Sequence, residues 1–599
     1  MGDEKSVLIT IPVALGATSM FLEIYDESGE RLLREIEGVY LGGEAGEESY
    51  SFNLDMGVGL YYASPRISVF SETLYGRKDG LDVVFDGRGE KIQLSISDFR
   101  YVAPEKMYGG TIYHIFVDRF ARGGEVVQPE YVNLVEGEWE VIPEYPEYPG
   151  AFLKNNTFYG GNLYGIIDKL DYIASLGVSA LYLSPIFESV SNHKYDTADY
   201  MKVDCGFGGE EALKKLIKAA DARGIKIILD GVFNHTGSDS FYFNKKARYD
   251  SIGAYQAKES QFFDWFDFKE FPDKYTCWWD IEILPRINPD KASCREFFTG
   301  DDGVISKYKK MGVYGFRLDV ADELSDDFIS EIKTRLSSEF ESVLYGEVWE
   351  DASNKIAYGQ RKTYYLGKEL DGVMNYPLRK ALIEYVNNKN CAELRYVFDE
   401  VFVNTPERIL NAQMNFLGTH DTERILTILG NSCSSGFTNA ELSVKKMDKE
   451  ARKLAERKLM GLYTVLATLP GVPTIFYGDE AGLEGYHDPF NRMPYPWGRE
   501  SLKLISRYKA IGNVRKNNPV YKNGVFKLLA LDTDALVFER KSGKDTFVTV
   551  FNNSDEKITI GFDTTAVALL SGCEKKIFDI EPFGAEIFKI SESVYRFFK

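Results

Sequence analysis

The stretch Val313-Tyr-Gly-Phe-Arg-Leu-Asp-Val-Ala-Asp322 has the pattern of a buried strand that ends in charged residues. Side chains alternate along a strand, so Arg317 and Asp319 are predicted to point to the same face. A neighbouring guanidinium favours the ionised form of a carboxyl group and fixes its direction. A buried ion pair with a purely structural role explains this stretch equally well when the stretch is considered alone.

Two more apolar runs of the chain also end in single acids. They are Ser342-Val-Leu-Tyr-Gly-Glu347 and Met414-Asn-Phe-Leu-Gly-Thr-His-Asp421. An isolated strand-end acid often only holds a loop, but three such acids on separate strands indicate a shared site.

From Thr111 onward the chain alternates between strand and helix patterns, which is typical of an α/β fold. Apolar residues recur at helical spacing over Leu163–Leu176, and Gly177 is placed as a helix C-cap. A second helix is predicted around Glu210–Arg223. The predicted strands are Thr111–Asp118, Ala180–Pro185, Lys226–Asp230, the stretch quoted first, Ser342–Glu347, Gly372–Tyr376, Met414–Leu417 and Val472–Gly478. Eight such strands predict a closed parallel (β/α)8 TIM barrel.

The regions outside this alternation predict further domains. Short strand-like runs with Gly-rich and acidic turns predict an N-terminal β-sandwich over residues 1–105. The barrel is predicted over 106–235 and 304–518, with an aromatic-rich B subdomain inserted at 236–303. A return to short strands predicts a C-terminal β-sandwich over 519–599.

Composition narrows the range of partners. Lys and Arg number 71 and Asp and Glu 91, so the net charge is 71 − 91 = −20. This balance argues against nucleic acid or an anionic membrane as partner. The aromatic share of 14% suits a neutral ligand with flat apolar faces, such as a sugar, although an aromatic core gives the same composition.

The six cysteines show no CxxC or Cys/His metal spacing and are predicted to be free thiols, with one disulfide as an open alternative. The N-terminus opens acidic and lacks the apolar run of a signal peptide. No segment reaches the roughly 18 apolar residues of a membrane span. The default expectation is a cytoplasmic protein, and an extracellular one if this chain is a trimmed piece of a secreted protein.

In a barrel of this kind the active site lies at the carboxyl ends of the strands. The polar residues predicted there are Asp230, Asn234, His235, Arg317, Asp319, Asp322, Glu323, Glu347, His420, Asp421, Asp479 and Glu480. Three carboxylates with flanking His and Arg suit glycoside hydrolysis, in which one carboxylate attacks and another protonates the leaving oxygen. The sequence contains no HExxH motif, no Walker loop and no nucleophile elbow with a serine. His114 falls inside a strand and is expected to be a core histidine.

Four motifs resemble, in order and spacing, the signature regions of the α-amylase family of glycoside hydrolases. They are Asp230-Gly-Val-Phe-Asn-His235, Gly315-Phe-Arg-Leu-Asp319, Gly346-Glu-Val-Trp349 and Phe416-Leu-Gly-Thr-His-Asp421. The resemblance covers about Thr111 to Lys599 and implies a barrel with a B subdomain after the third strand and a C-terminal β-sandwich.

The resemblance also implies roles for individual residues. Asp319 would be the nucleophile, Glu347 the general acid/base and Asp421 the transition-state stabiliser. The expected substrate-binding residues are His193, Tyr195, His235, Arg317, Glu323, Trp349, His420, Asp488 and Arg492.

Two features resemble the neopullulanase, cyclomaltodextrinase and maltogenic amylase branch of the family. Leu284-Pro-Arg-Ile-Asn288 is similar to a Met-Pro-Lys-Leu-Asn segment of that branch, and Glu323 stands four residues after the expected nucleophile. The loop after Asp118-Arg-Phe120 departs from the branch, because it lacks an Asn/Asp-rich calcium-binding run. No cofactor is expected; Asn234 matches a calcium-ligand position of some α-amylases, so calcium stays open without a clear ligand motif. The N-terminal domain resembles a starch-binding type only loosely.

These observations predict a retaining, endo-acting hydrolase of α-1,4-glucosidic bonds in starch, maltodextrins and pullulan, with some cleavage of α-1,6 bonds. The alternatives are a cyclomaltodextrinase, an α-glucan transglycosylase and, less favoured, a non-catalytic glucan-binding relative. The expected partner is an α-glucan, with neither nucleic acid nor membrane, and a homodimer stays an open alternative.

Overall fold

The computed structural model describes residues 6–44, 46–79, 82–135, 139–148, 151, 153–338, 340–590 and 595–598. The chain divides into two compact units. One contains Met1–Tyr101, Asp351–Glu369 and Arg395–Ile409, and the other contains Val102–Glu350, Leu370–Leu394 and Leu410–Lys599. Each unit is described by itself.

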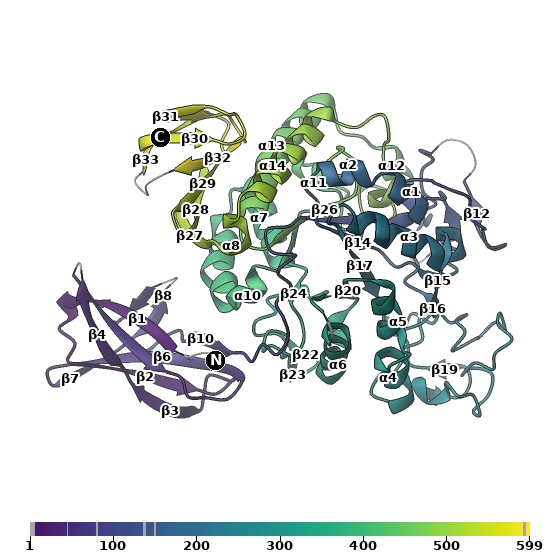
Figure 1. Ribbon diagram of the computed structural model, residues 1–599, viewed down its shortest axis with the longest axis horizontal. Helices are drawn as coiled ribbons and strands as arrows, with labels where there is room; N and C mark the ends of the chain where they lie inside the picture. The colour runs from purple at the N-terminus through teal and green to yellow at the C-terminus, as the bar shows by residue number, and fades with distance from the viewer. Residues whose placement is uncertain are drawn as a thin grey trace. The chain divides into compact units, whose positions relative to one another are not determined.

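The second unit is built on an eight-stranded parallel sheet with the order β24-β21-β20-β17-β14-β11-β26-β25, of which β14, β17, β20, β24 and β26 are labelled in Figure 1. In chain order its strands are β11 (Ile112–Ile115), β14 (Ala180–Leu183), β17 (Lys226–Gly231), β20 (Gly315–Leu318), β21 (Val343–Gly346), β24 (Gly372–Val373), β25 (Met414–Phe416) and β26 (Val472–Phe476). A parallel bridge between Met374 and Met414 joins the two edge strands and closes the barrel. All eight predicted strands are confirmed, and the barrel core includes Tyr182, Ile228, Tyr345 and Phe416.

The helices follow the predicted alternation, with one correction. The stretch predicted as a single helix forms two, α1 (Leu163–Asp168) and α2 (Leu170–Ser175), because Lys169 leaves helical conformation at φ −103° and ψ 3°. Gly177 has φ +78°, as its predicted capping position requires. The longer helices of this unit are α3 (Gly209–Asp221), α4 (Ala292–Thr299), α5 (Val304–Met311), α6 (Asp326–Ser337), α7 (Tyr376–Asn388), α13 (Lys449–Thr468) and α14 (Leu502–Asn517).

The segment between β17 and α5 is largely irregular. It contains the short pair β18 (Phe268–Glu270) and β19 (Lys274–Tyr275) and packs around aromatic rings. Trp265 stacks on Tyr242 with ring centroids 5.3 Å apart. The aromatic residues that mark this segment in the sequence therefore form its core.

The strands at the carboxyl end of the chain form a seven-stranded antiparallel sheet around its own core. They are β27 (Val525–Leu531), β28 (Ala535–Ser542), β29 (Asp545–Asn552), β30 (Ile558–Ala568), β31 (Glu574–Ile580), β32 (Ala585–Ile590) and β33 (Tyr595–Phe598). The sheet contacts the barrel through α13, which packs on β29 and β32 (Figure 1). Tyr385 of α7 donates a 2.8 Å hydrogen bond to the carbonyl of Asp532.

The first unit holds most of the N-terminal strands in two antiparallel sheets, and β8 (Arg77–Asp79) and β9 (Asp82–Val84) form a separate antiparallel pair. The orders are β1-β5-β4 and β10-β6-β2-β3, with β7 paired to β6. The strands are β1 (Ser6–Pro12), β2 (Ser19–Tyr25), β3 (Leu32–Glu37), β4 (Val39–Glu44), β5 (Glu47–Asn53), β6 (Gly59–Val69), β7 (Glu72–Tyr75) and β10 (Ile92–Ile96). Met20, Leu22, Phe52 and Ile67 form the core between the sheets. Residues 351–369 and 395–409 join this unit, with Gln93 donating to the Ser353 hydroxyl at 3.1 Å and Lys78 paired with Glu400.

All six cysteines are free, as predicted. None of the described helices has both the length and the apolar character needed to cross a bilayer.

Candidate active site

Four charged residues meet at the carboxyl ends of neighbouring barrel strands. Asp230 on β17 lies beside Arg317 on β20, and Asp319 and Glu347 directly follow β20 and β21. Arg317 is completely buried; its Nη1 is 2.9 Å from Asp230 Oδ1 and 2.8 Å from Asp319 Oδ1. Its Nη2 is 3.0 Å from Glu347 Oε2. We call these four residues the Arg317 cluster.

The charges of the Arg317 cluster do not balance. Burial raises the pKa of Asp319 well above its ordinary value, and the neighbouring Glu347 and Asp230 raise it further, while Arg317 opposes the rise. Burial also raises the pKa of Asp230, against the effect of Arg317 and two tyrosine hydroxyls. Asp319 and Asp230 share one guanidinium, so these two groups titrate as a pair and retain a proton more readily than isolated acids. One ionised and one protonated carboxyl is the pair that acid-assisted displacement needs.

The residue after Asp319 has an unusual backbone. Val320 has φ +40° and ψ +55°, a left-handed conformation that is costly for a β-branched residue. In this conformation its N–H donates to Glu347 Oε2 at 2.9 Å. Trp349 Nε1 lies 3.3 Å from the other oxygen, Glu347 Oε1. The strained turn therefore helps to orient Glu347.

A second group of site residues comes from loops. Tyr195 donates its hydroxyl proton to Asp230 Oδ2 at 2.9 Å and accepts a hydrogen bond from His420 Nε2. The Tyr195 and His420 rings stack with centroids 5.2 Å apart and an interplanar angle of 6°. Burial and nearby cationic groups hold the pKa of His420 well below its ordinary value, so its imidazole is neutral. A continuous chain of hydrogen bonds therefore connects these loops to the Arg317 cluster.

Asp421 is held between His420 and the segment after β26. Its Oδ2 is 3.1 Å from His420 Nε2, and its Oδ1 is 3.4 Å from Arg492 Nη2. Arg492 also donates to the His420 carbonyl at 2.8 Å and pairs with Asp488 at 3.0 Å. Burial raises the pKa of Asp421 to about 7, against the effect of Arg492, and Glu347 raises it further. The third predicted carboxylate thus lies within electrostatic reach of the Arg317 cluster.

The two remaining predicted histidines hold the Tyr195 segment. His235 Nε2 donates to the Tyr195 carbonyl at 3.2 Å, and His193 Nδ1 accepts from the Tyr195 N–H at 3.1 Å. Burial lowers the pKa of His235 to about 4. We call the residues of this second group the loop cluster: His193, Tyr195, His235, His420, Asp421 and Arg492.

Aromatic rings extend from both clusters toward solvent. Trp349 is 50% exposed and stacks on Tyr376, with centroids 3.8 Å apart. Trp278 stacks on His235 at 5.4 Å and on Trp279 at 5.1 Å, and Trp279 is 75% exposed. Exposed flat rings of this kind suit the apolar faces of sugars.

Glu323 lies on the short helix η6 (Ala321–Glu323) and belongs to neither cluster as defined. Its carboxylate is 3.5 Å from Arg286 Nη2, which also donates to the Glu323 carbonyl at 3.0 Å. This pair connects the inserted segment to the loop that follows Asp319.

The structure adds supporting residues that sequence reasoning missed. Tyr182 on β14 donates to Asp230 at 2.6 Å, and an inward-facing tyrosine in a barrel strand was the available signal. Lys194 is buried, pairs with Asp204 at 2.6 Å and holds φ +60° between His193 and Tyr195. A lysine between two site residues resembles any solvated lysine in sequence, so its burial had no signal. His114 is a buried core residue, as predicted, with its Nε2 3.1 Å from the Ser184 hydroxyl.

Asn234 is the residue that the sequence leaves open as a calcium ligand. Asn234 turns its amide nitrogen to His235 Nδ1 at 3.4 Å. The Asp118 carboxylate accepts from the Tyr159 and Gly160 N–H groups and from Arg119, which occupies its oxygens. Over the described ranges no group of three His, Cys, Asp or Glu side chains is placed to hold a metal ion.

Known proteins share this sequence and architecture. Amylopullulanase of Thermoanaerobacterium thermosulfurigenes is 36% identical over 539 residues, which cover 81% of this chain and 28% of that protein. Neopullulanase 2 of Thermoactinomyces vulgaris is 31% identical over 476 residues, covering 77% of this chain and 72% of that protein. The ligand-free cyclic α-maltosyl-(1→6)-maltose hydrolase of Arthrobacter globiformis superposes with a TM-score of 0.67 at 27% identity, covering 81% of this chain and 100% of that one.

The length of the match differs among these relatives. The chain spans only 28% to 42% of three amylopullulanases that it matches. The family model described as "Alpha amylase, catalytic domain" matches residues 115–517. This match includes all eight barrel strands except the first residues of β11, and it includes both clusters of site residues. The chain belongs to the α-amylase family of glycoside hydrolases.

Proposed function

We propose that this protein hydrolyses internal α-1,4-glucosidic bonds of starch, maltodextrins and pullulan with retention of configuration. We propose that it also cleaves some α-1,6 bonds. The observation that carries the proposal is the placement of Asp319 and Glu347 on adjacent nitrogens of one buried guanidinium, with Asp421 nearby. Two carboxyl groups this close suit direct attack by one of them rather than by an intervening water.

In the proposed reaction Asp319 attacks the anomeric carbon while Glu347 donates its proton to the departing glycosidic oxygen. This forms a covalent glycosyl ester on Asp319 and releases the first product. Glu347, now ionised, removes a proton from water, which attacks the same carbon and restores Asp319. Two inversions give net retention.

The other residues bind and orient the sugar at the cleavage point. Arg317 holds Asp319 and Glu347 in place. Asp421, His420 and His235 present polar atoms to sugar hydroxyls, with both histidines neutral because burial lowers their pKa values. Tyr195 supplies a ring beside the cleavage point, Arg492 and Asp488 bind hydroxyls on one side of it, and Trp349 stacks on a sugar on the other.

A second candidate is transfer of the glycosyl group to a sugar instead of water, or ring opening of cyclodextrins. The exposed Trp349 and Trp279 rings favour it, because an acceptor sugar held on an aromatic ring competes with water. A non-catalytic glucan-binding role is disfavoured because all three predicted catalytic carboxyl groups, those of Asp319, Glu347 and Asp421, are present at the site.

Product analysis on pullulan tests the proposal most directly. Panose as the main product means α-1,4 cleavage, maltotriose means α-1,6 cleavage, and no product from pullulan or starch contradicts the proposal. NMR of the first turnovers should show the α-anomer. Asp319→Asn should lose roughly 10⁴-fold or more in kcat while keeping the fold, as removal of a nucleophile does. Longer oligosaccharides formed from maltotriose, or rapid opening of β-cyclodextrin, would favour the second candidate.

Two further expectations stay predictions. The domain boundaries near residues 105, 235, 304 and 518 are testable by limited proteolysis, with cuts expected near 105 and 518. A homodimer is testable by light scattering of the purified chain.

A further inference from the structure

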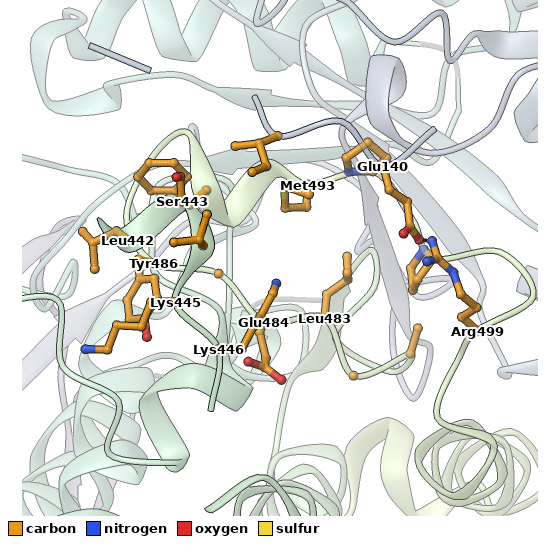
Figure 2. Close-up of a pocket in the computed structure, with 18 of the residues that line it drawn as sticks. Glu140, Leu442, Ser443, Lys445, Lys446, Leu483, Glu484, Tyr486, Met493 and Arg499 are labelled. Atoms are coloured by element: carbon orange, nitrogen blue, oxygen red, sulfur yellow. Dashed lines mark ion pairs between the residues drawn. The ribbon is translucent and has the colours of Figure 1, made fainter. Parts of the chain in front are cut away.

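A second pocket lies outside both site clusters. It has a volume of about 550 Å³ and lies between the end of α12 (Asn439–Val444) and residues 481–499 (Figure 2). Leu442, Leu483, Phe490 and Met493 supply its apolar lining. This volume is in the range of small-molecule sites.

Two lysines, Lys445 and Lys446, line this pocket. In Figure 2 the ammonium group of Lys446 points into the hollow of the pocket. Lys445 donates to the Cys433 carbonyl at 2.7 Å and lies over the Phe437 ring. Neither lysine forms an ion pair with an Asp or Glu of the described residues. The ammonium group of Lys446 is therefore available to an anion.

The other charged residues of the pocket are already paired. Arg452 pairs with Glu484 on one wall, and Arg499 pairs with Glu140 on another. A guanidinium beside a carboxylate offers a donor and an acceptor close together, which suits adjacent hydroxyl groups of a sugar. The pocket thus combines an anion-binding lysine with two walls suited to hydroxyls.

The pocket lies next to a segment that also carries part of the loop cluster. Phe490 begins η8 (Phe490–Arg492), whose last residue contacts Asp421. Tyr486 and Phe490 flank the turn that carries Asp488, and both line the pocket. The pocket and the proposed cleavage site therefore share a segment of backbone but present different side chains.

We infer that this pocket is a binding site for a phosphorylated mono- or disaccharide, with the phosphate on Lys446 and the sugar hydroxyls on the Arg452–Glu484 and Arg499–Glu140 pairs. The ligand lies outside the cleavage site and is not hydrolysed there. The inference concerns binding alone and stands whether or not the proposed function is correct.

The test is calorimetric titration of the full chain with glucose 6-phosphate, inorganic phosphate and maltose, in the Asp319→Asn background so that no turnover occurs. The expected result is binding of glucose 6-phosphate with Lys446→Gln weakening it roughly tenfold or more, the typical cost of losing a charged hydrogen bond. The matched control is Lys449→Gln, an exposed lysine at the start of α13 and outside the pocket lining, which should leave the affinity unchanged.

Each other outcome overturns part or all of the inference. If inorganic phosphate binds as tightly as glucose 6-phosphate, the sugar adds nothing to the affinity and that part of the inference is wrong. Displacement of the ligand by maltotriose would place it in the cleavage site. Absence of binding, or equal affinity in Lys446→Gln, would overturn the site itself. Ser443→Phe, which fills the pocket without changing its charge, should abolish binding independently of Lys446.

Discussion

The Arg317 cluster and the loop cluster lie next to each other but are built in different ways. The Arg317 cluster comes from three adjacent barrel strands, and one guanidinium contacts all three of its carboxyl groups. The loop cluster comes from segments far apart in the chain, and Tyr195 and His420 are 225 residues apart. Strand pairing alone sets the first arrangement, whereas the second needs each loop to be anchored separately.

The difference predicts which measured property should change when a residue of each cluster is substituted. Buried, charge-bearing groups in the Arg317 cluster perform the proposed bond chemistry, so changing one should reduce kcat without changing the barrel. The loop cluster depends on supports such as the Lys194–Asp204 pair, so changing a support should affect stability and substrate affinity together.

The largest expected effect is on the Arg317 cluster. Glu347→Gln should reduce kcat by about 10² to 10⁴-fold, the usual contribution of a general acid/base. Azide should restore turnover of an activated aryl maltoside, because this nucleophile needs no base. The matched control is Glu350→Gln, an exposed acid three residues later. A loss under tenfold for Glu347→Gln, or no recovery with azide, would contradict its role.

The next effect concerns the support of the loop cluster. Lys194→Met leaves Asp204 buried without its partner, which should destabilise the protein by about 3 to 5 kcal/mol. The exposed pair of Lys215 with Glu211 on α3 offers a contrast, and Lys215→Met should leave the free energy of unfolding nearly unchanged. Denaturant unfolding and KM should be measured for both variants. Equal stability of the two variants would show that burial of the Lys194 pair is unimportant.

A third prediction uses pH to report on the loop cluster. The pKa of His235 is about 4 in the folded protein, against an ordinary value of 6.5, because burial disfavours its charged form. The unfolded chain therefore binds more protons between these pH values, and stability from this group is complete above 6.5 and lost as pH falls through 4. The contribution reaches about 3 kcal/mol.

His235→Gln should remove that contribution. Stability of the variant should fall less than that of the parent between pH 6.5 and 4, measured by urea unfolding at several pH values. Groups that titrate in both proteins contribute equally to the two curves of stability against pH, so the difference between the curves reports on His235. Parallel stability curves for the two proteins would contradict a neutral, buried His235.

The smallest expected effect is at the exposed ring beside the Arg317 cluster. Trp349→Ala should raise KM for maltodextrins by roughly 3 to 10-fold, equivalent to about 1 kcal/mol of lost stacking. Trp349→Phe keeps a ring on Tyr376 but removes the N–H near Glu347, so it should restore most of the affinity. An Ala variant with unchanged KM and reduced kcat would mean that Trp349 acts through Glu347 and not through the sugar.

The sequence by itself determined the barrel and the Arg317 cluster. Strand-end positions follow from local patterns, and alternation along a strand places Arg317 and Asp319 on one face whatever the rest of the chain does. In the loop cluster, His235, His420 and Asp421 were also predicted from their positions at strand ends, whereas Tyr195 and Arg492 were named only through the resemblance of their motifs to a known family. The single predicted helix over 163–176 was wrong because spacing of apolar residues does not detect a break at one residue such as Lys169.

Only the tertiary structure decided which partners support these residues. The burial of Lys194, the left-handed turn at Val320, the Arg286–Glu323 pair and the pocket behind Phe490 each depend on contacts between distant segments. Side-chain burial and pKa values depend on what surrounds a group in space, and the sequence neighbours of that group do not specify those surroundings.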